Sequence, residues 1–206
     1  MDKSQIWPTI HAERKALAAD LENLTYEQWA TPSLCDGWTV RDVLAHMTGT
    51  AQMTPAKFFP RLIASGFSLP RLQDKDIKRI KKGDTLTAFK GEVNSSSAPP
   101  GPRLTWLGET LVHGDDIRRA VGIKYDYPPD ATAAVADSYK GSNLVIGAKK
   151  RIAGLKLVAT DTDWTHGDGP EVRGPMIALL MVMAGREAAL SDLSGDGVAT
   201  LQQRLT

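Results

Sequence analysis

The chain has 206 residues, enough for one domain with a sizeable core or for one domain with a small appendage. Its 25 lysines and arginines nearly balance 24 aspartates and glutamates, and a net charge of +1 gives no electrostatic case for nucleic acid as the main partner. The single cysteine, Cys35, excludes an internal disulfide and favours a reducing compartment. No signal pattern begins the sequence, and its longest apolar run, 176–184, is too short to cross a bilayer. We therefore expect a soluble cytoplasmic protein with no nucleic-acid and no membrane partner.

Helical periodicity dominates the first part of the chain. Residues 4–24 carry apolar side chains at helical spacing, with charged residues between them. Thr39, followed three residues later by Asp42, approximates a capping box and predicts the start of a second helix. His46 lies at the edge of the apolar face of this helix, and Pro55 and Pro60 are expected to kink or end it. The apolar face consists of Val40, Val43, Leu44 and Met47.

The middle of the chain alternates helices with connections. The basic run at 70–82 is typical of a solvated helix face. A short helix is expected around 85–93, and the serine- and proline-rich segment 95–102 reads as a turn-rich connection. A long helix then covers about 103–121, where Gly122 stops it.

The last third of the chain changes character. A helix over about 130–142 precedes an alternating stretch, 155–160, that predicts a strand. We expect a bundle over residues 1–145 and a small α/β region, 146–206, packed on it. The remaining expected elements are a loop at 161–169, a short strand at 171–173, and helices near 175–185 and 197–205.

A polar stripe on the 103–121 helix is the main chemical signal. Glu109, His113 and Asp116 are spaced by three or four residues and so share one face, amid apolar neighbours. Polar groups among buried apolar side chains must be hydrogen-bonded, paired or bound to a metal. These residues alone leave two interpretations open, a metal site or a core histidine satisfied by Glu109.

Several common catalytic motifs are absent from the sequence, and one group of possible metal ligands remains. The sequence has no phosphate-binding loop, nucleophile elbow, Cys-x-x-Cys or His-Glu-x-x-His. Cys35 has no histidine adjacent in sequence, so we expect an ordinary, partly buried thiol. His46 with Glu109 and His113 can fill three corners around a metal ion and leave one open, as in catalytic sites.

Three segments carry a resemblance to a known family. Residues 29–46, 108–119 and the tail from 167 to 186 resemble the mycothiol-dependent maleylpyruvate isomerase family of DinB-like metal-binding bundles. The resemblance implies a mainly α fold, an up-and-down four-helix bundle with a small C-terminal α/β appendage. It also implies one divalent ion, usually zinc, held by His46, Glu109 and His113.

The same resemblance implies a function. In that family a low-molecular-weight thiol, mycothiol or a similar one, takes the metal's open position and attacks a small electrophile, giving isomerisation or S-transfer. A C-terminal arginine binds the anionic substrate; Arg186 is the expected counterpart and Arg173 its rival. Asp116 is expected to hold the second ring nitrogen of a histidine ligand, or to contact substrate or water. The short C-terminal region predicts a substrate other than maleylpyruvate.

Two other function classes remain open at this point. Two histidines and a carboxylate also form the facial triad of non-haem iron oxygenases, although those usually sit on a β-barrel. A non-catalytic metal- or small-ligand-binding stress-response protein on the same fold is the main alternative. The sequence also leaves a homodimer open.

Overall fold

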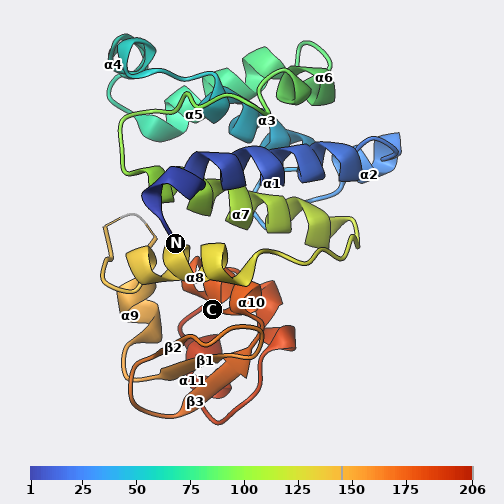
Figure 1. The fold of residues 1–206 in the computed structure, drawn as a ribbon. Coiled ribbons are helices and arrows are strands. Elements are labelled where there is room, and N and C mark those ends of the chain that lie inside the picture. Colours follow the sequence, from blue (N-terminus) through green and yellow to red (C-terminus); the bar gives the residue numbers. More distant parts are fainter. Residues whose placement is uncertain (145, 206) are drawn as a thin grey trace. The chain divides into compact units, whose positions relative to one another are not determined.

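The computed structural model describes residues 1–144 and 146–205, which divide into two compact units (Figure 1). One unit is Asp2–Tyr125, and the other comprises Met1 and the chain from Asp126 onward. The predicted boundary lay after residue 145, whereas this division falls between Tyr125 and Asp126. The difference arises because α8 (Pro129–Tyr139) packs against α10 (Met176–Met183) and so belongs with the C-terminal unit.

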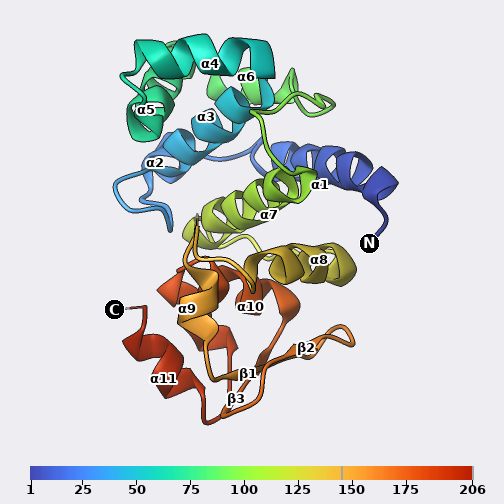
Figure 2. The ribbon, with the colours of Figure 1, turned by 90° about the vertical axis from the view of Figure 1, so that its left-hand side faces the viewer.

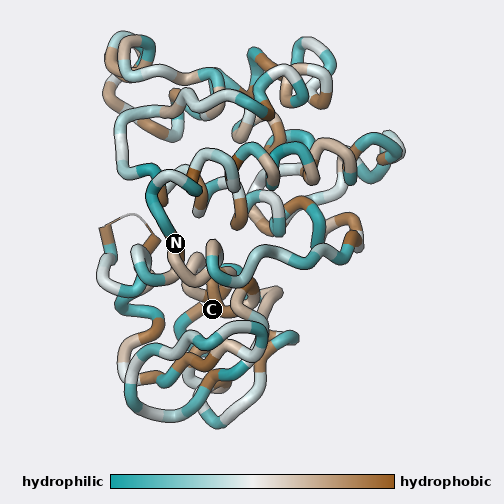
Figure 3. The backbone as a smooth tube through the Cα atoms, viewed as in Figure 1, coloured by the Kyte–Doolittle hydropathy of each residue, from teal (hydrophilic) through white to brown (hydrophobic). Residues whose placement is uncertain are grey.

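The N-terminal unit is a helical bundle. Its long helices are α1, α3, α5 and α7; α7 packs against both α1 and α3, and α3 packs against α5 (Figures 1 and 2). Hydrophobic and hydrophilic residues alternate along these helices (Figure 3), which places one face of each in the core. The bounds are η1 Lys3–Gln5, α1 Ile6–Asp20, α2 Tyr26–Ala30, α3 Val40–Ala51, α4 Pro55–Ala64, α5 Leu69–Ile80, α6 Thr85–Lys90 and α7 Arg103–Ala120.

The start of α3 is fixed by the capping box that the sequence predicts. The Thr39 hydroxyl accepts a hydrogen bond from the backbone N–H of Asp42 at 3.2 Å, and the Asp42 carboxylate accepts one from the N–H of Thr39 at 3.0 Å. The apolar face that follows is fully buried and contributes Val40, Val43, Leu44 and Met47 to the main core. The cap and the buried face together set the position of His46 along the bundle.

The segment between α3 and α6 differs in part from the expectation. Pro55 does not kink α3, which ends earlier, but occupies the first turn of a separate helix, α4, where its missing N–H is harmless. The basic run lies on α5 as a solvated face, as predicted, with Lys75 and Lys78 exposed. Leu72 and Ile77 on the opposite face of α5 are buried.

The C-terminal unit combines a small sheet with short helices. The strand order is β2-β1-β3, with β1 antiparallel to β2 and parallel to β3. Asp161 accepts a hydrogen bond from the N–H of Met176 and so caps α10, whose apolar residues are almost all buried. The remaining bounds are α9 Ala148–Ile152, β1 Lys156–Ala159, β2 Thr165–His166, β3 Glu171–Gly174, η2 Glu187–Asp192 and α11 Val198–Gln203.

The predicted fold class is confirmed: the chain is mainly α, with a helical bundle followed by a small C-terminal α/β part. The short elements α2, α9, η2 and β2 were not predicted, and β2 lies in a segment that was expected to be a loop. Over the described ranges, 1–144 and 146–205, no helix has both the length and the apolar character that crossing a membrane requires.

The cap of α3 gives a stability prediction. Thr39→Ala removes the side-chain acceptor for the Asp42 N–H, and we expect the free energy of unfolding to fall by about 1 kcal/mol. Urea denaturation followed by circular dichroism measures the change. Thr39→Ser keeps the hydroxyl and should stay close to wild type; an equal loss in both variants would contradict this role of the hydroxyl.

Candidate metal centre

Two packed helices and one loop of the N-terminal unit bring the candidate residues together. Helix α3 carries His46, and α7 carries Glu109, His113 and Asp116 on one face. Cys35 lies in the loop that precedes α3. Because α3 packs against α7, the polar stripe of one helix faces the histidine of the other.

The three predicted metal ligands lie close to one another. Nε2 of His46 is 3.9 Å from Oε1 of Glu109, and the side chains are only 12% and 10% exposed. The rings of His46 and His113 meet edge to face, with their centroids 5.1 Å apart. The structure places these side chains near one another, but among the described residues the group whose possible ligand atoms all lie within 4.8 Å of one another is Cys35, His113 and Asp116, and not this set. The role of His46, Glu109 and His113 as metal ligands stays a prediction.

Glu109 is a buried carboxylate whose oxygens make no close hydrogen bond with the described residues. Both of its oxygens are inaccessible, and neither has a partner among residues 1–144 and 146–205. Burial raises the pKa of Glu109, and the charges of His113 and Arg14, with weaker contributions from the hydroxyls of Thr50 and Thr110, offset part of this effect. Because buried polar atoms in native proteins are almost always satisfied, such a carboxylate beside two imidazoles fits a cation that completes the site.

His46 is a buried imidazole with a strongly lowered pKa. Burial, with a smaller contribution from the charge of His113, lowers its pKa to about 3. The imidazole is therefore uncharged at neutral pH, and one ring nitrogen has a lone pair available. The ring of Trp38 packs over it, with the centroids 5.1 Å apart, and helps to keep water away.

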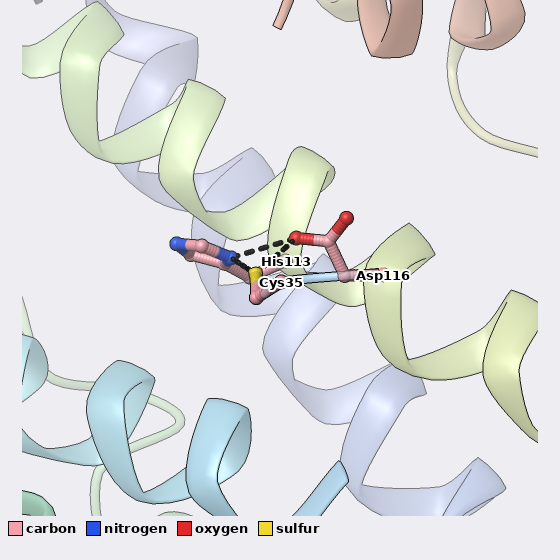
Figure 4. A group of neighbouring side chains, drawn as sticks. All are labelled: Cys35, His113 and Asp116. Atoms are coloured by element: carbon pink, nitrogen blue, oxygen red, sulfur yellow. Dashed lines mark hydrogen bonds and ion pairs between the residues drawn. The ribbon is translucent and has the colours of Figure 1, made fainter. Parts of the chain in front are cut away.

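His113, Asp116 and Cys35 form a second group on the other side of the His113 ring (Figure 4). Nδ1 of His113 is 2.9 Å from Oδ2 of Asp116, and the Cys35 thiol donates to the same oxygen at 3.0 Å. Burial alone would lower the pKa of His113, but its hydrogen bonds with Asp116 and Cys35 outweigh it and raise that pKa. Asp116 is fully buried and contacts Nδ1 of His113, and its role in supporting a histidine ligand stays a prediction.

Cys35 is the site residue that the sequence reasoning missed. Its Sγ lies 3.6 Å from Nδ1 of His113, although the sequence offered no neighbouring histidine and predicted an ordinary thiol. The loop is closed by a bridge between Pro32 and Thr39 and by a hydrogen bond from the Trp38 N–H to the Cys35 carbonyl. These contacts turn Cys35 toward α7, and no local spacing pattern could have revealed them.

The two arginines considered for substrate binding lie in the C-terminal unit. Arg186 immediately precedes η2, is half-buried, and donates to the carbonyl of Ala184 at 2.8 Å. Arg173 is exposed on β3, and its Nε donates to Glu171 at 2.7 Å. The catalytic role assigned to Arg186 stays a prediction.

The sequence of the first part of the chain matches a known family. Residues 10–88 fit the family model of the mycothiol maleylpyruvate isomerase N-terminal domain. This part of the chain is therefore similar to that domain. The matched span contains Cys35 and His46 but ends before α7, so Glu109, His113 and Asp116 rest on the structure and on the motif resemblance alone.

Solved structures extend the similarity of this domain to the whole fold. The crystal structure of the mycothiol-dependent maleylpyruvate isomerase superposes with a TM-score of 0.62 at 14% identity, covering 95% of this chain and 93% of that one. A variant of that isomerase with one histidine replaced by alanine gives 0.54 at 15% identity, with the same coverage. At this identity the likeness shows the fold alone. None of the curated protein sequences is similar enough to this chain to count as a relative.

Replacing the Glu109 carboxylate is expected to stabilise the metal-free protein and to weaken metal binding. In metal-free protein, Glu109→Gln removes a buried charge and should raise the free energy of unfolding by roughly 1–3 kcal/mol. The same variant should lose the further stabilisation that zinc gives to the wild type. Thermal unfolding with a chelator and with added zinc measures both effects.

An exposed glutamate supplies the control for this prediction. Glu22 pairs with Lys90 at the surface, with its side chain 53% exposed, so Glu22→Gln should change stability little in either condition. Destabilisation of the metal-free protein by Glu109→Gln, with zinc stabilisation intact, would show that the carboxylate is satisfied by the fold itself.

Proposed function

We propose that this protein is a divalent-metal-dependent enzyme that activates a low-molecular-weight thiol, mycothiol or a similar one, for isomerisation of a small electrophile or for transfer to it. The observation that carries the proposal is the orphaned, buried carboxylate of Glu109 between two helices that also bring His46 and His113 to it. The N-terminal family match supports the thiol, because that family is named for mycothiol.

The donor set fits zinc or a similar divalent ion. His46, Glu109 and His113 offer two imidazoles and one carboxylate, the ligand types of catalytic zinc sites with three protein ligands and one open position. When bound, the ion would favour the thiolate form of a thiol in that open position. Other side chains would hold the ligands in position and shape the space around the ion.

Asp116 and Trp38 are the residues that hold the histidines. The Asp116 carboxylate takes the hydrogen bond at Nδ1 of His113, which orients the ring and leaves its other nitrogen for the ion. Trp38 packs against both imidazoles, with centroids 5.1 Å from His46 and 6.5 Å from His113. Its indole restricts ring rotation and limits water access on that side.

Arg186 is proposed to bind an anionic group of the electrophile. Burial, with a smaller contribution from the charge of Arg186, lowers the pKa of Arg151, so two guanidinium groups of the C-terminal unit lie near each other. Arg151 already donates to the carbonyls of Ile146 and Met183, which fixes it in place. Two neighbouring like charges favour a bound anion, and a carboxylate is the planar partner that guanidinium groups prefer.

Loss of a metal ligand should abolish both metal binding and thiol chemistry. We expect zinc-loaded wild type to consume thiol in the presence of an α,β-unsaturated carboxylate, and His46→Ala to lose stoichiometric zinc and at least 100-fold of that rate. Elemental analysis of tag-free protein and a thiol-consumption assay measure the two quantities.

A histidine outside the site serves as the control. His11 on α1 contacts the Ser95 carbonyl at 3.2 Å, and His11→Ala should retain zinc and activity. Wild-type protein that binds zinc but consumes no thiol with any electrophile would refute the enzymatic proposal, while wild-type protein that binds no zinc would refute the metal site as well.

The anion-binding role of Arg186 predicts a selective effect on the Michaelis constant. Arg186→Ala should raise KM for an anionic electrophile about tenfold or more, with the zinc content unchanged, because it removes a charged hydrogen-bond donor. Arg173→Ala removes an exposed arginine already paired with Glu171, and its kinetics should match the wild type. Equal effects of the two substitutions would contradict the assignment.

A further inference from the structure

Three side chains on the Nδ1 side of His113 form a compact donor cluster. Sγ of Cys35, a ring nitrogen of His113 and a carboxylate oxygen of Asp116 all lie within 4.8 Å of one another (Figure 4). We propose that this cluster is a second cation site, specific for a thiophilic divalent ion such as zinc, cobalt or cadmium. Neither the cluster nor its test depends on thiol chemistry at the first site.

The spacing of the donor atoms fits tetrahedral coordination with little movement. With metal–sulfur and metal–nitrogen bonds of about 2.3 and 2.0 Å, neighbouring donor atoms of a tetrahedral zinc site lie about 3.3–3.6 Å apart. The sulfur of Cys35 is already 3.6 Å from Nδ1 of His113. The two contacts to Oδ2 of Asp116, 3.0 and 2.9 Å, would each lengthen by about half an ångström as hydrogen bonds give way to metal bonds.

The chemistry of the donors selects a thiophilic ion. A thiolate, an imidazole and a carboxylate suit zinc and its analogues, whereas magnesium and calcium prefer oxygen donors alone. As the metal bonds form, the Cys35 thiol loses its proton to solvent and Nδ1 of His113 gives up the proton that it shares with Asp116, so two protons are released and no redox change is needed. Asp116 is fully buried, and its negative charge then faces the cation directly.

The second site is distinct from the first because the two use opposite nitrogens of one ring. In Figure 4 the other ring nitrogen of His113 points away from Cys35 and Asp116. Cys35 is only half-buried.

Cobalt(II) absorption tests this site because a thiolate–cobalt signal can come only from Cys35. A thiolate bound to cobalt gives a charge-transfer band in the near ultraviolet, and Cys35 is the only cysteine of the sequence. Titration of the full-length wild type should produce this band. Cys35→Ser should abolish it and keep the visible cobalt bands of the first site, while His46→Ala and Glu109→Gln should keep the charge-transfer band.

Each outcome separates the second site from the first. A charge-transfer band in His46→Ala protein that consumes no thiol supports the second site whatever becomes of the proposed enzyme activity. Asp116→Asn should weaken the cobalt affinity measured at this band at least tenfold. Wild-type protein that binds cobalt without the band, or a band that persists in folded Cys35→Ser, would overturn the proposal.

Discussion

The buried carboxylate of Glu109 is the constraint on which the account of this molecule depends. Helix α7 carries several charged residues into the interior, and its other acidic residues have close partners: Asp115 pairs with Arg119, and Asp116 contacts His113. Glu109 alone among these acidic residues has two buried oxygens without a partner in the part of the chain that the structure describes. This buried carboxylate is the feature of α7 on which the proposed metal site rests.

The groups around that carboxylate lie on two sides of the His113 imidazole. On one side His46, neutral because it is buried, stands beside Glu109. On the other side Asp116 and Cys35 gather at Nδ1 of His113. The ring of His113 therefore lies between His46 on one side and its contacts with Asp116 and Cys35 on the other. Trp38 holds both imidazoles from a third direction.

Sequence alone was sufficient where the signal was periodic or local. The spacing of Glu109, His113 and Asp116 predicted a shared helix face, and the capping box at Thr39 predicted the start of α3. The sequence did not predict the features that depend on tertiary contacts. Helices α2 and α9 have five residues each, too few for a period to show. Cys35 reaches His113 only through the closure of its loop, and α8 joins the C-terminal unit only through its packing on α10.

Anomalous diffraction from zinc-soaked crystals is the most direct test of the central claim. The account predicts an anomalous peak within about 2–2.5 Å of donor atoms of His46, Glu109 and His113, with the Glu109 carboxylate bonded to the ion. Crystals that bind no ion there, and in which Glu109 instead accepts hydrogen bonds from protein groups or ordered water, would contradict it.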